Sequence, residues 1–161
     1  MNIFYLHEDP IEAAKLQYNK HVVKMILESA QMLCTAHHHY GNDTVPYKKA
    51  HYNHPSTIWV RQNSKQYRWL FYHMLALGAE YTNRYGKGHG ACKHQISLFQ
   101  GRFKIPEGKL TRHPQCFSGH DDLKTDEFMP IEAYRNFYIV DKSRFARYNY
   151  SQRPKWFKET A

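Results

Sequence analysis

A helical pattern of hydrophobic and polar residues covers residues 10–36, the longest regular stretch in the chain. At about 100° per residue, its apolar side chains share one arc of a helix, namely Leu16, Val22, Val23, Ile26, Leu27, Ala30 and Leu33. The opposite arc is polar and consists of Gln17, Lys20, His21, Lys24, Glu28 and Gln31. Acids at positions 8 and 9 and the proline at position 10 suit a helix start. The pattern predicts one long amphipathic helix over residues 10–36.

Further helices are predicted after a loop of histidines and turn-forming residues that follows Ala36. Ser56 can cap a short helix, and Ser64 can cap the helix after it. This second helix keeps apolar residues at helical spacing over residues 65–85, and the glycines that follow are expected to end it.

The rest of the chain is predicted to hold two more helices and a long loop. Residues 89–100 are a candidate helix, residues 101–125 form a loop, and a last helix opens at Met129. Its packed side is expected to carry Tyr134, Phe137, Tyr138 and Val140. The first six residues, MNIFYL, form either an initial strand or a buried segment. No repeat or linker is visible, so the sequence predicts one mostly helical, all-α domain over residues 1–161 with long loops.

The charge balance indicates a polyanionic partner. The chain has 23 Lys and Arg residues against 14 acids, a net charge of +9, with 13 Tyr interleaved. An excess of cations with aromatic residues for base stacking is typical of nucleic-acid-binding domains. Glu80 and Arg84, one helical turn apart, are expected to form a surface ion pair.

Other classes of protein are disfavoured by the sequence. No run approaches the roughly 20 apolar residues of a membrane span, and no secretory signal is evident, so we expect a cytoplasmic protein. Three widely separated cysteines, at positions 34, 92 and 116, argue against a disulfide framework.

The polar arc of the first helix has two interpretations. Spacing of four residues puts Lys20, Lys24 and Glu28 in one row, which is most simply a solvated surface. The alternative is a site, because two amines, the imidazole of His21 and a carboxylate could steer a phosphate, attack an electrophilic carbon and move a proton.

Two clusters of histidine and cysteine raise the question of a metal. They are His89, Cys92 and His94, and His113, Cys116 and His120. Zinc accepts such ligands, but neither cluster has the CxxC spacing typical of zinc ribbons. Three adjacent histidines at 37–39 are predicted to lie in a solvated loop. We therefore expect no metal and no cofactor.

The C-terminal segment 144–158 alternates cations with aromatic residues. Trp156 and Phe157, beside Arg153, Lys155 and Lys158, could stack on bases while the cations neutralise phosphates. The alternative is that the aromatic side chains dock this segment on the core.

Four stretches resemble the pyrimidine-dimer DNA glycosylase family, which includes the phage endonuclease V type. They are MNIFYLH at the N-terminus, YNKH at 18–21, YNHP at 52–55 and RPKWF at 153–157, in matching order and rough spacing. The stretch HVVKMILESAQMLCTA also resembles phage-encoded proteins that we associate with this group.

The resemblance implies a helical fold and base flipping on damaged DNA. In that family an N-terminal α-amine attacks the sugar C1′ and a Schiff base permits strand cleavage; α-amines in general titrate near pH 8 and are partly uncharged at neutrality. A helix carboxylate is essential there, and in our alignment Lys20 stands at its position. Asn2 is bulky enough to keep Met1, so Met1, Lys20 or Lys24 is the candidate nucleophile, and Glu28 or Glu8 the candidate acid/base.

The predicted function is therefore a DNA glycosylase/AP-lyase-like enzyme, a monomer acting on a damaged or modified pyrimidine in double-stranded DNA. The catalytic candidates are Met1, Lys20, His21, Lys24, Glu28 and His54. The candidate DNA contacts are Asn19, Arg61, Arg84, Lys87, Arg153, Lys155, Trp156 and Phe157. The alternatives are a base-modifying or nucleotide-modifying phage enzyme on the same scaffold, a non-catalytic DNA-binding module and, last, a zinc-dependent enzyme.

Overall fold

The computed structural model describes residues 1–100 and 104–158 and confirms the all-α fold, with no strand in these ranges. The α-helices are α1 (Pro10–Lys15), α2 (Asn19–His39), α3 (Pro55–Arg61), α4 (Ser64–Tyr85), α5 (Gln95–Gln100) and α6 (Ile131–Phe137). Shorter turns of helix are η1 (Gly90–His94), η3 (Asp121–Leu123) and η4 (Tyr138–Lys142), the last of π type. No helix in the described ranges is long and apolar enough to cross a membrane.

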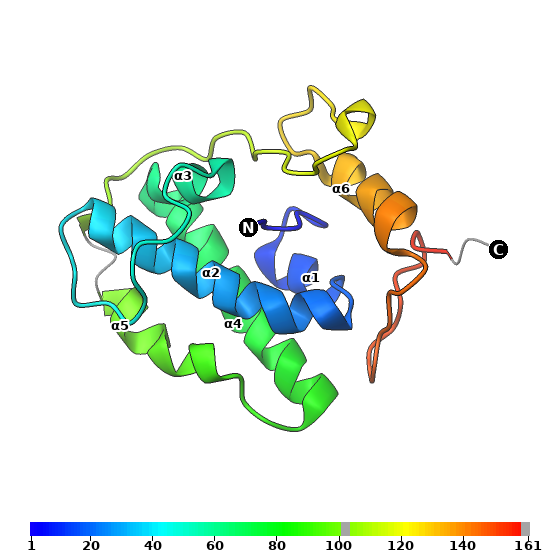
Figure 1. Ribbon diagram of the computed structural model, residues 1–161, viewed down its shortest axis with the longest axis horizontal. Coiled ribbons are helices and arrows are strands. Elements are labelled where there is room, and N and C mark those ends of the chain that lie inside the picture. The colour runs from blue at the N-terminus through cyan, green and yellow to red at the C-terminus, as the bar shows by residue number, and fades with distance from the viewer. Residues whose placement is uncertain (101–103, 159–161) are drawn as a thin grey trace.

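The two long helices α2 and α4 pack against each other at the centre of the fold, as Figure 1 shows, and α1 and α3 also pack on this pair. The N-terminal segment MNIFYL enters the same core. Of the two alternatives for it, a strand or a buried segment, the structure shows the buried segment. Phe4, Tyr5 and Leu6 are buried. The Phe4 ring stacks on His21 of α2 at 3.8 Å between centroids and lies parallel to Phe137 of α6 at 6.3 Å.

The prediction of one helix over residues 10–36 is wrong, because the chain breaks between α1 and α2. Tyr18 has an extended backbone, with φ −76° and ψ 164°. Gln17, predicted on the polar arc, is completely buried, and its amide nitrogen donates to His73 Nε2 at 3.0 Å. The apolar arc also differs, since Val23 and Leu27 are more than one-third exposed.

A buried arginine of α4 binds the chain at the break between α1 and α2. Arg84 donates to the carbonyl oxygens of Gln17 at 2.7 Å and Lys15 at 3.2 Å, and it pairs with Glu80 at 2.9 Å. The Arg84 side chain is completely buried, so the predicted surface pair is an interior one. A charge can be buried only when it is paired and its donors are satisfied. These contacts therefore fix where α2 starts.

The helix ends differ from the predictions in detail. His54 rather than Ser56 caps α3, and Asn63 rather than Ser64 caps α4, each through a side chain that accepts a backbone N–H. Gly86 ends α4 with φ +70°, as predicted, because that backbone conformation favours glycine.

Later segments agree with the sequence only in part. The three adjacent histidines belong to α2, not to a loop. Of the candidate helix 89–100, residues 90–100 are helical, as η1 followed by α5. The predicted loop 101–125 begins with three residues that lie outside the described ranges, and the rest of it is irregular apart from η3. In the last helix Tyr134, Phe137 and Tyr138 are buried as predicted, but Val140 is 60% exposed.

Protonation of His73 is expected to loosen the contact between α4 and the chain around α1. His73 Nδ1–H donates to the Pro10 carbonyl at 2.8 Å, and burial lowers the pKa of His73 to about 4. An unfolded histidine binds a proton near pH 6.5, so this stability is complete above that pH and is lost as the pH falls towards 4, by about 3 kcal/mol at pH 4.

The test is a His73→Asn variant, whose amide can still donate to Pro10. The stability difference between wild type and variant, from urea unfolding, should shrink by about 3 kcal/mol between pH 7 and pH 4. A difference that stays the same at both pH values would contradict the assignment.

Candidate active site

The α-amine at the start of the chain lies against a carboxylate of α2. The Met1 nitrogen is 3.7 Å from Glu28 Oε2, and the Asn2 backbone N–H donates to the same oxygen at 3.2 Å. Lys24 Nζ is 3.3 Å from the other oxygen, Oε1. The Glu28 side chain is only 13% exposed. One sheltered carboxylate therefore holds the amine on one side and a lysine on the other.

The side chain of Asn2 fixes the end of the chain in this position. Its Nδ2 donates to the Cys116 carbonyl at 2.6 Å, and its Oδ1 accepts the Ile3 N–H at 2.8 Å. Because both ends of the Asn2 amide are hydrogen-bonded, the side chain cannot rotate without losing these bonds. The α-amine is thus positioned one residue before an anchored side chain.

A buried tyrosine of α6 connects the Asn2 side chain to the loop that contains Pro114 and Cys116. The Tyr134 hydroxyl lies 2.8 Å from the Pro114 carbonyl and 3.1 Å from Asn2 Oδ1, and it accepts the Cys116 N–H at 3.2 Å. Burial raises the pKa of Tyr134, so the hydroxyl keeps its proton and remains a donor. Three distant parts of the chain therefore meet at this hydroxyl.

A cleft of about 480 Å³ lies beside Met1. Volumes of about 300–1,000 Å³ are typical of small-ligand sites. The lining comes from the first residue, the start of α3 and the loop 115–124: Met1, His54, Pro55, Gln115, Cys116, Phe117, Ser118, Gly119, Asp121 and Lys124. The cleft brings a ligand beside Met1, and its lining includes the cationic Lys124, the acidic Asp121 and uncharged polar side chains.

His54 faces this cleft as a neutral imidazole. Its Nδ1 accepts the Ser56 N–H at 3.2 Å, so the neutral ring carries its proton on Nε2. Burial lowers the pKa of His54, and the positive charge of the N-terminus lowers it further, against a smaller opposite effect of Glu28. His54 can therefore donate a hydrogen bond at neutral pH.

Two of the predicted catalytic residues lie away from the amine. Lys20 is two helical turns before Glu28, and its Nζ lies 5.5 Å from the Phe145 ring centroid. His21 is buried, its Nδ1 is 2.7 Å from the Tyr138 hydroxyl, and burial lowers its pKa well below the ordinary value. The structure thus brings together Met1, Lys24, Glu28 and His54 but neither Lys20 nor His21. The carboxylate beside the amine is Glu28, and the alignment of the family's essential acid with Lys20 stays a prediction.

Several predicted DNA contacts are interior residues. Asn19, Arg61, Arg84 and Phe157 are each no more than 9% exposed. Asn19 Oδ1 accepts the Asn149 N–H, and the Arg61 guanidinium lies over the Tyr52 ring at 3.9 Å. Such side chains support the fold, and their contact with DNA stays a prediction.

The C-terminal segment docks on the core through its aromatic residues. Phe157 is buried, and Arg153 Nε donates to its carbonyl at 2.6 Å. Trp156 is half-buried beneath the Arg135 guanidinium, 5.3 Å from its ring centroid. Of the predicted contacts, only Lys87 and Lys155 are exposed.

The two clusters of histidine and cysteine are not assembled around a common point. In residues 1–100 and 104–158, no three side chains of His, Cys, Asp or Glu converge as metal ligands. His113 instead packs against the rings of Tyr5 and Trp59, with centroids 3.1 and 3.9 Å away.

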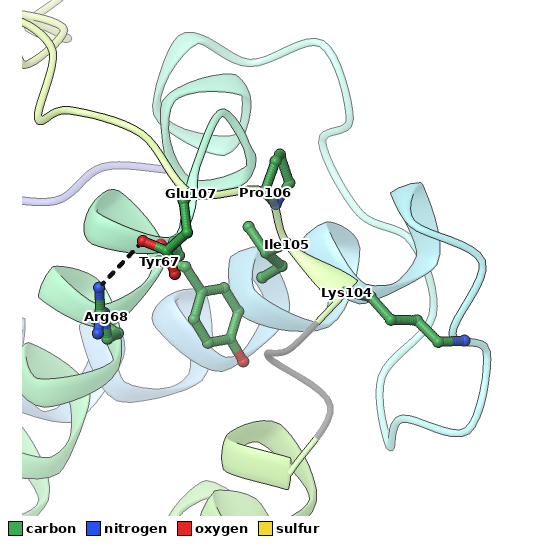
Figure 2. A pocket seen from close by; sticks show the side chains of 7 residues that line it. Tyr67, Arg68, Lys104, Ile105, Pro106 and Glu107 are labelled. Atoms are coloured by element: carbon green, nitrogen blue, oxygen red, sulfur yellow. Dashed lines mark ion pairs between the residues drawn. The ribbon is translucent and has the colours of Figure 1, made fainter.

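A second cavity, shown in Figure 2, lies at the start of α4. It has a volume of about 330 Å³, and its lining includes Tyr67, Ile105 and an ion pair of 3.8 Å between Arg68 and Glu107. Lys104 points away from the cavity in this view. None of the residues around the Met1 amine lines it, so the cleft at the N-terminus is the candidate active site.

The sequence did not reveal Asn2, Tyr134 or the loop 115–124 as parts of the site. The loop has no hydrophobic period, and Tyr134 was expected only to pack. A hint was present at Asn2, since an amide inside the apolar stretch MNIFYL needs buried partners.

Comparisons with known proteins identify a family. A family model described as pyrimidine dimer DNA glycosylase matches residues 1–93, which include Met1, all of α2 and His54. No curated protein and no solved structure matches the chain.

Removing the Tyr134 hydroxyl is expected to weaken the anchor at Asn2. In a Tyr134→Phe variant the ring still fills its place, but buried polar groups of Pro114, Cys116 and Asn2 lose a partner. The free energy of unfolding should fall by about 1–3 kcal/mol. Urea unfolding measures this, with the exposed Tyr150→Phe as the matched control. Equal stabilities for the two variants would show that the hydroxyl does not hold the site together.

Proposed function

The chain belongs to the pyrimidine dimer DNA glycosylase family, and from this premise we propose that the α-amine of Met1 is the nucleophile of a glycosylase/lyase reaction. Family membership makes the function one of the DNA glycosylase type, with DNA as substrate. The finer assignment depends on one observation, the distance of 3.7 Å between the amine and Glu28.

In the first step the uncharged amine attacks C1′ of a damaged or modified pyrimidine nucleotide. The new N–C1′ bond forms as the glycosidic bond breaks, and the base leaves with the bonding electron pair and takes up a proton. The amine nitrogen gives up a proton to Glu28, the acceptor within reach. A positioned carboxylate acting in this way is worth about 10²–10⁴ in rate.

The second step opens the sugar. The C1′–O4′ bond breaks, O4′ takes a proton, and the nitrogen loses its remaining proton to leave an imine, the Schiff base. The imine withdraws electrons, so a base can remove a proton from C2′. The 3′ C–O bond then breaks and the phosphate leaves, which cleaves the strand.

Two neighbours of the amine have supporting roles in this proposal. Lys24 holds Oε1 of Glu28 and so leaves Oε2 directed at the amine. His54 presents its Nε2–H to the cleft, where it can donate to the leaving base or to a phosphate. The cleft of about 480 Å³ would receive the nucleotide after it leaves the base stack.

The position of the amine favours an enzyme over a binding module. A module that only binds DNA would not need a sheltered carboxylate beside the chain terminus, since desolvating that acid costs free energy unless partners compensate. Base-modifying chemistry on the same scaffold would leave the contact between Met1 and Glu28 without a role. We therefore favour amine catalysis.

Trapping with borohydride tests the proposal. The protein is incubated with duplex DNA carrying an abasic site or a pyrimidine dimer, and borohydride reduces the imine to a stable amine link. We expect a covalent adduct, and peptide mass spectrometry should locate it at the Met1 nitrogen. Location at Lys20 or Lys24 would overturn the assignment of the nucleophile.

Glu28→Gln should slow adduct formation by about 100-fold or more, because an amide cannot accept the proton. The matched control is Glu132→Gln, which changes an exposed carboxylate of α6 and should keep the wild-type rate. No adduct on either substrate, with DNA binding intact, would favour a non-catalytic module.

A further inference from the structure

Four cations form a row that leads away from the candidate active site, and we call Lys20, Lys24, Lys142 and Arg144 the cation ridge. Three of them surround one aromatic ring. The centroid of Phe145 lies 5.5 Å from Lys20 Nζ, 5.8 Å from Lys142 Nζ and 5.5 Å from Arg144 Cζ. The ridge therefore joins the start of α2 to the end of η4.

Lys24 connects the ridge to the amine. It lies one helical turn from Lys20 on α2 and contacts Glu28, which holds Met1. Lys24 and Lys142 also both act on the buried His21, whose pKa is lowered mainly by burial and then by these two positive charges. Figure 1 shows the beginning of α2 and the chain after α6 on the same side of the molecule.

The ridge carries an excess of positive charge. Its two acidic neighbours are committed, since Glu28 contacts Met1 and Lys24 while Asp141 pairs with Lys142 and His120. Lys20 and Arg144 are exposed, and within the described residues no carboxylate lies within ion-pair distance of either. Like charges gathered at a surface repel one another unless an anion lies between them.

We propose that the cation ridge binds the phosphodiester backbone of DNA beside the nucleotide whose C1′ meets the amine. The proposal rests on the proposed function, which places DNA at Met1. Lys20 and Arg144, whose charged groups both lie beside the Phe145 ring, contact phosphates, and Lys24 forms the junction with the site. Lys20 thus serves in binding rather than as the nucleophile.

The ridge is supported over the other basic residues by its continuity with the site. Lys87 and Lys155 are exposed, but neither lines the cleft at Met1. Phosphates next to an extruded nucleotide must lie close to the group that attacks its sugar. A row of cations that begins one contact from the amine meets that requirement.

The salt dependence of binding measures phosphate contacts directly. Affinity for a short undamaged duplex is followed by fluorescence anisotropy over a salt series, for Lys20→Ala and Arg144→Ala. Each variant should lower the magnitude of the log–log slope by about 0.9 and weaken binding about 8-fold near 0.1 M salt. Lys20→Arg should restore the slope.

The matched control is Lys93→Ala, an exposed lysine of η1, which should keep the wild-type slope. A second variant should bind DNA more tightly, and a misfolded protein would not give that result. Asp141→Asn takes away the carboxylate that pairs with Lys142, so binding should tighten and the slope should become steeper.

Different results would refute the cation ridge and the proposed function. If Lys20→Ala and Arg144→Ala keep the wild-type slope, or Asp141→Asn does not tighten binding, the ridge is not a phosphate site, whatever borohydride trapping shows. If the slopes change as expected but no adduct forms even at saturating DNA, the ridge stands and amine catalysis does not.

Discussion

The contact between the chain's first nitrogen and Glu28 depends on burial of the five residues that follow it. Phe4, Tyr5 and Leu6 are buried in the core. Burying a large apolar side chain stabilises a protein by about 1.5–3 kcal/mol, and ordering a residue costs about 1–2 kcal/mol in backbone entropy. The two effects nearly balance over so short a segment. The polar anchors at Asn2 therefore decide whether the amine reaches the carboxylate or frays into solvent.

The same constraint explains why the fold carries so many polar groups in its interior. Gln17, His73 and Arg84 hold the break between α1 and α2, and Tyr134 holds the loop over Asn2. Each of these groups is costly to bury without a partner, and each has one. A helix running unbroken from Pro10 would carry α2 in a different direction, so the break sets the position of Glu28 relative to Met1.

The sequence predicted the helical class, the approximate spans of the helices and the family, because these follow from hydrophobic period and local motifs. It predicted the residues of the candidate site only in part. Glu28 was a candidate acid and Met1 a candidate nucleophile, yet no sequence rule joins positions 1 and 28. Their contact is set by tertiary packing of the N-terminal segment, which has no helical period of its own. His21 was a candidate catalytic residue because of its charged neighbours, but its ring stacks on Phe4.

Charge was the least reliable guide to position. The net charge of +9 pointed to nucleic acid, but it could not separate cations that hold the fold from cations that face a partner. Arg84 and Arg61 belong to the first kind, since their donors are used by interior carbonyls. We propose that Lys20 and Arg144 belong to the second kind, since both side chains are exposed and their charged groups lie beside the Phe145 ring. An arginine with its five donors suits an interior junction of several carbonyls, whereas a lysine on a flexible stem suits a solvated phosphate. Burial, more than sequence spacing, therefore identifies the cations that hold the fold, and the exposed cations are the ones that we propose for binding.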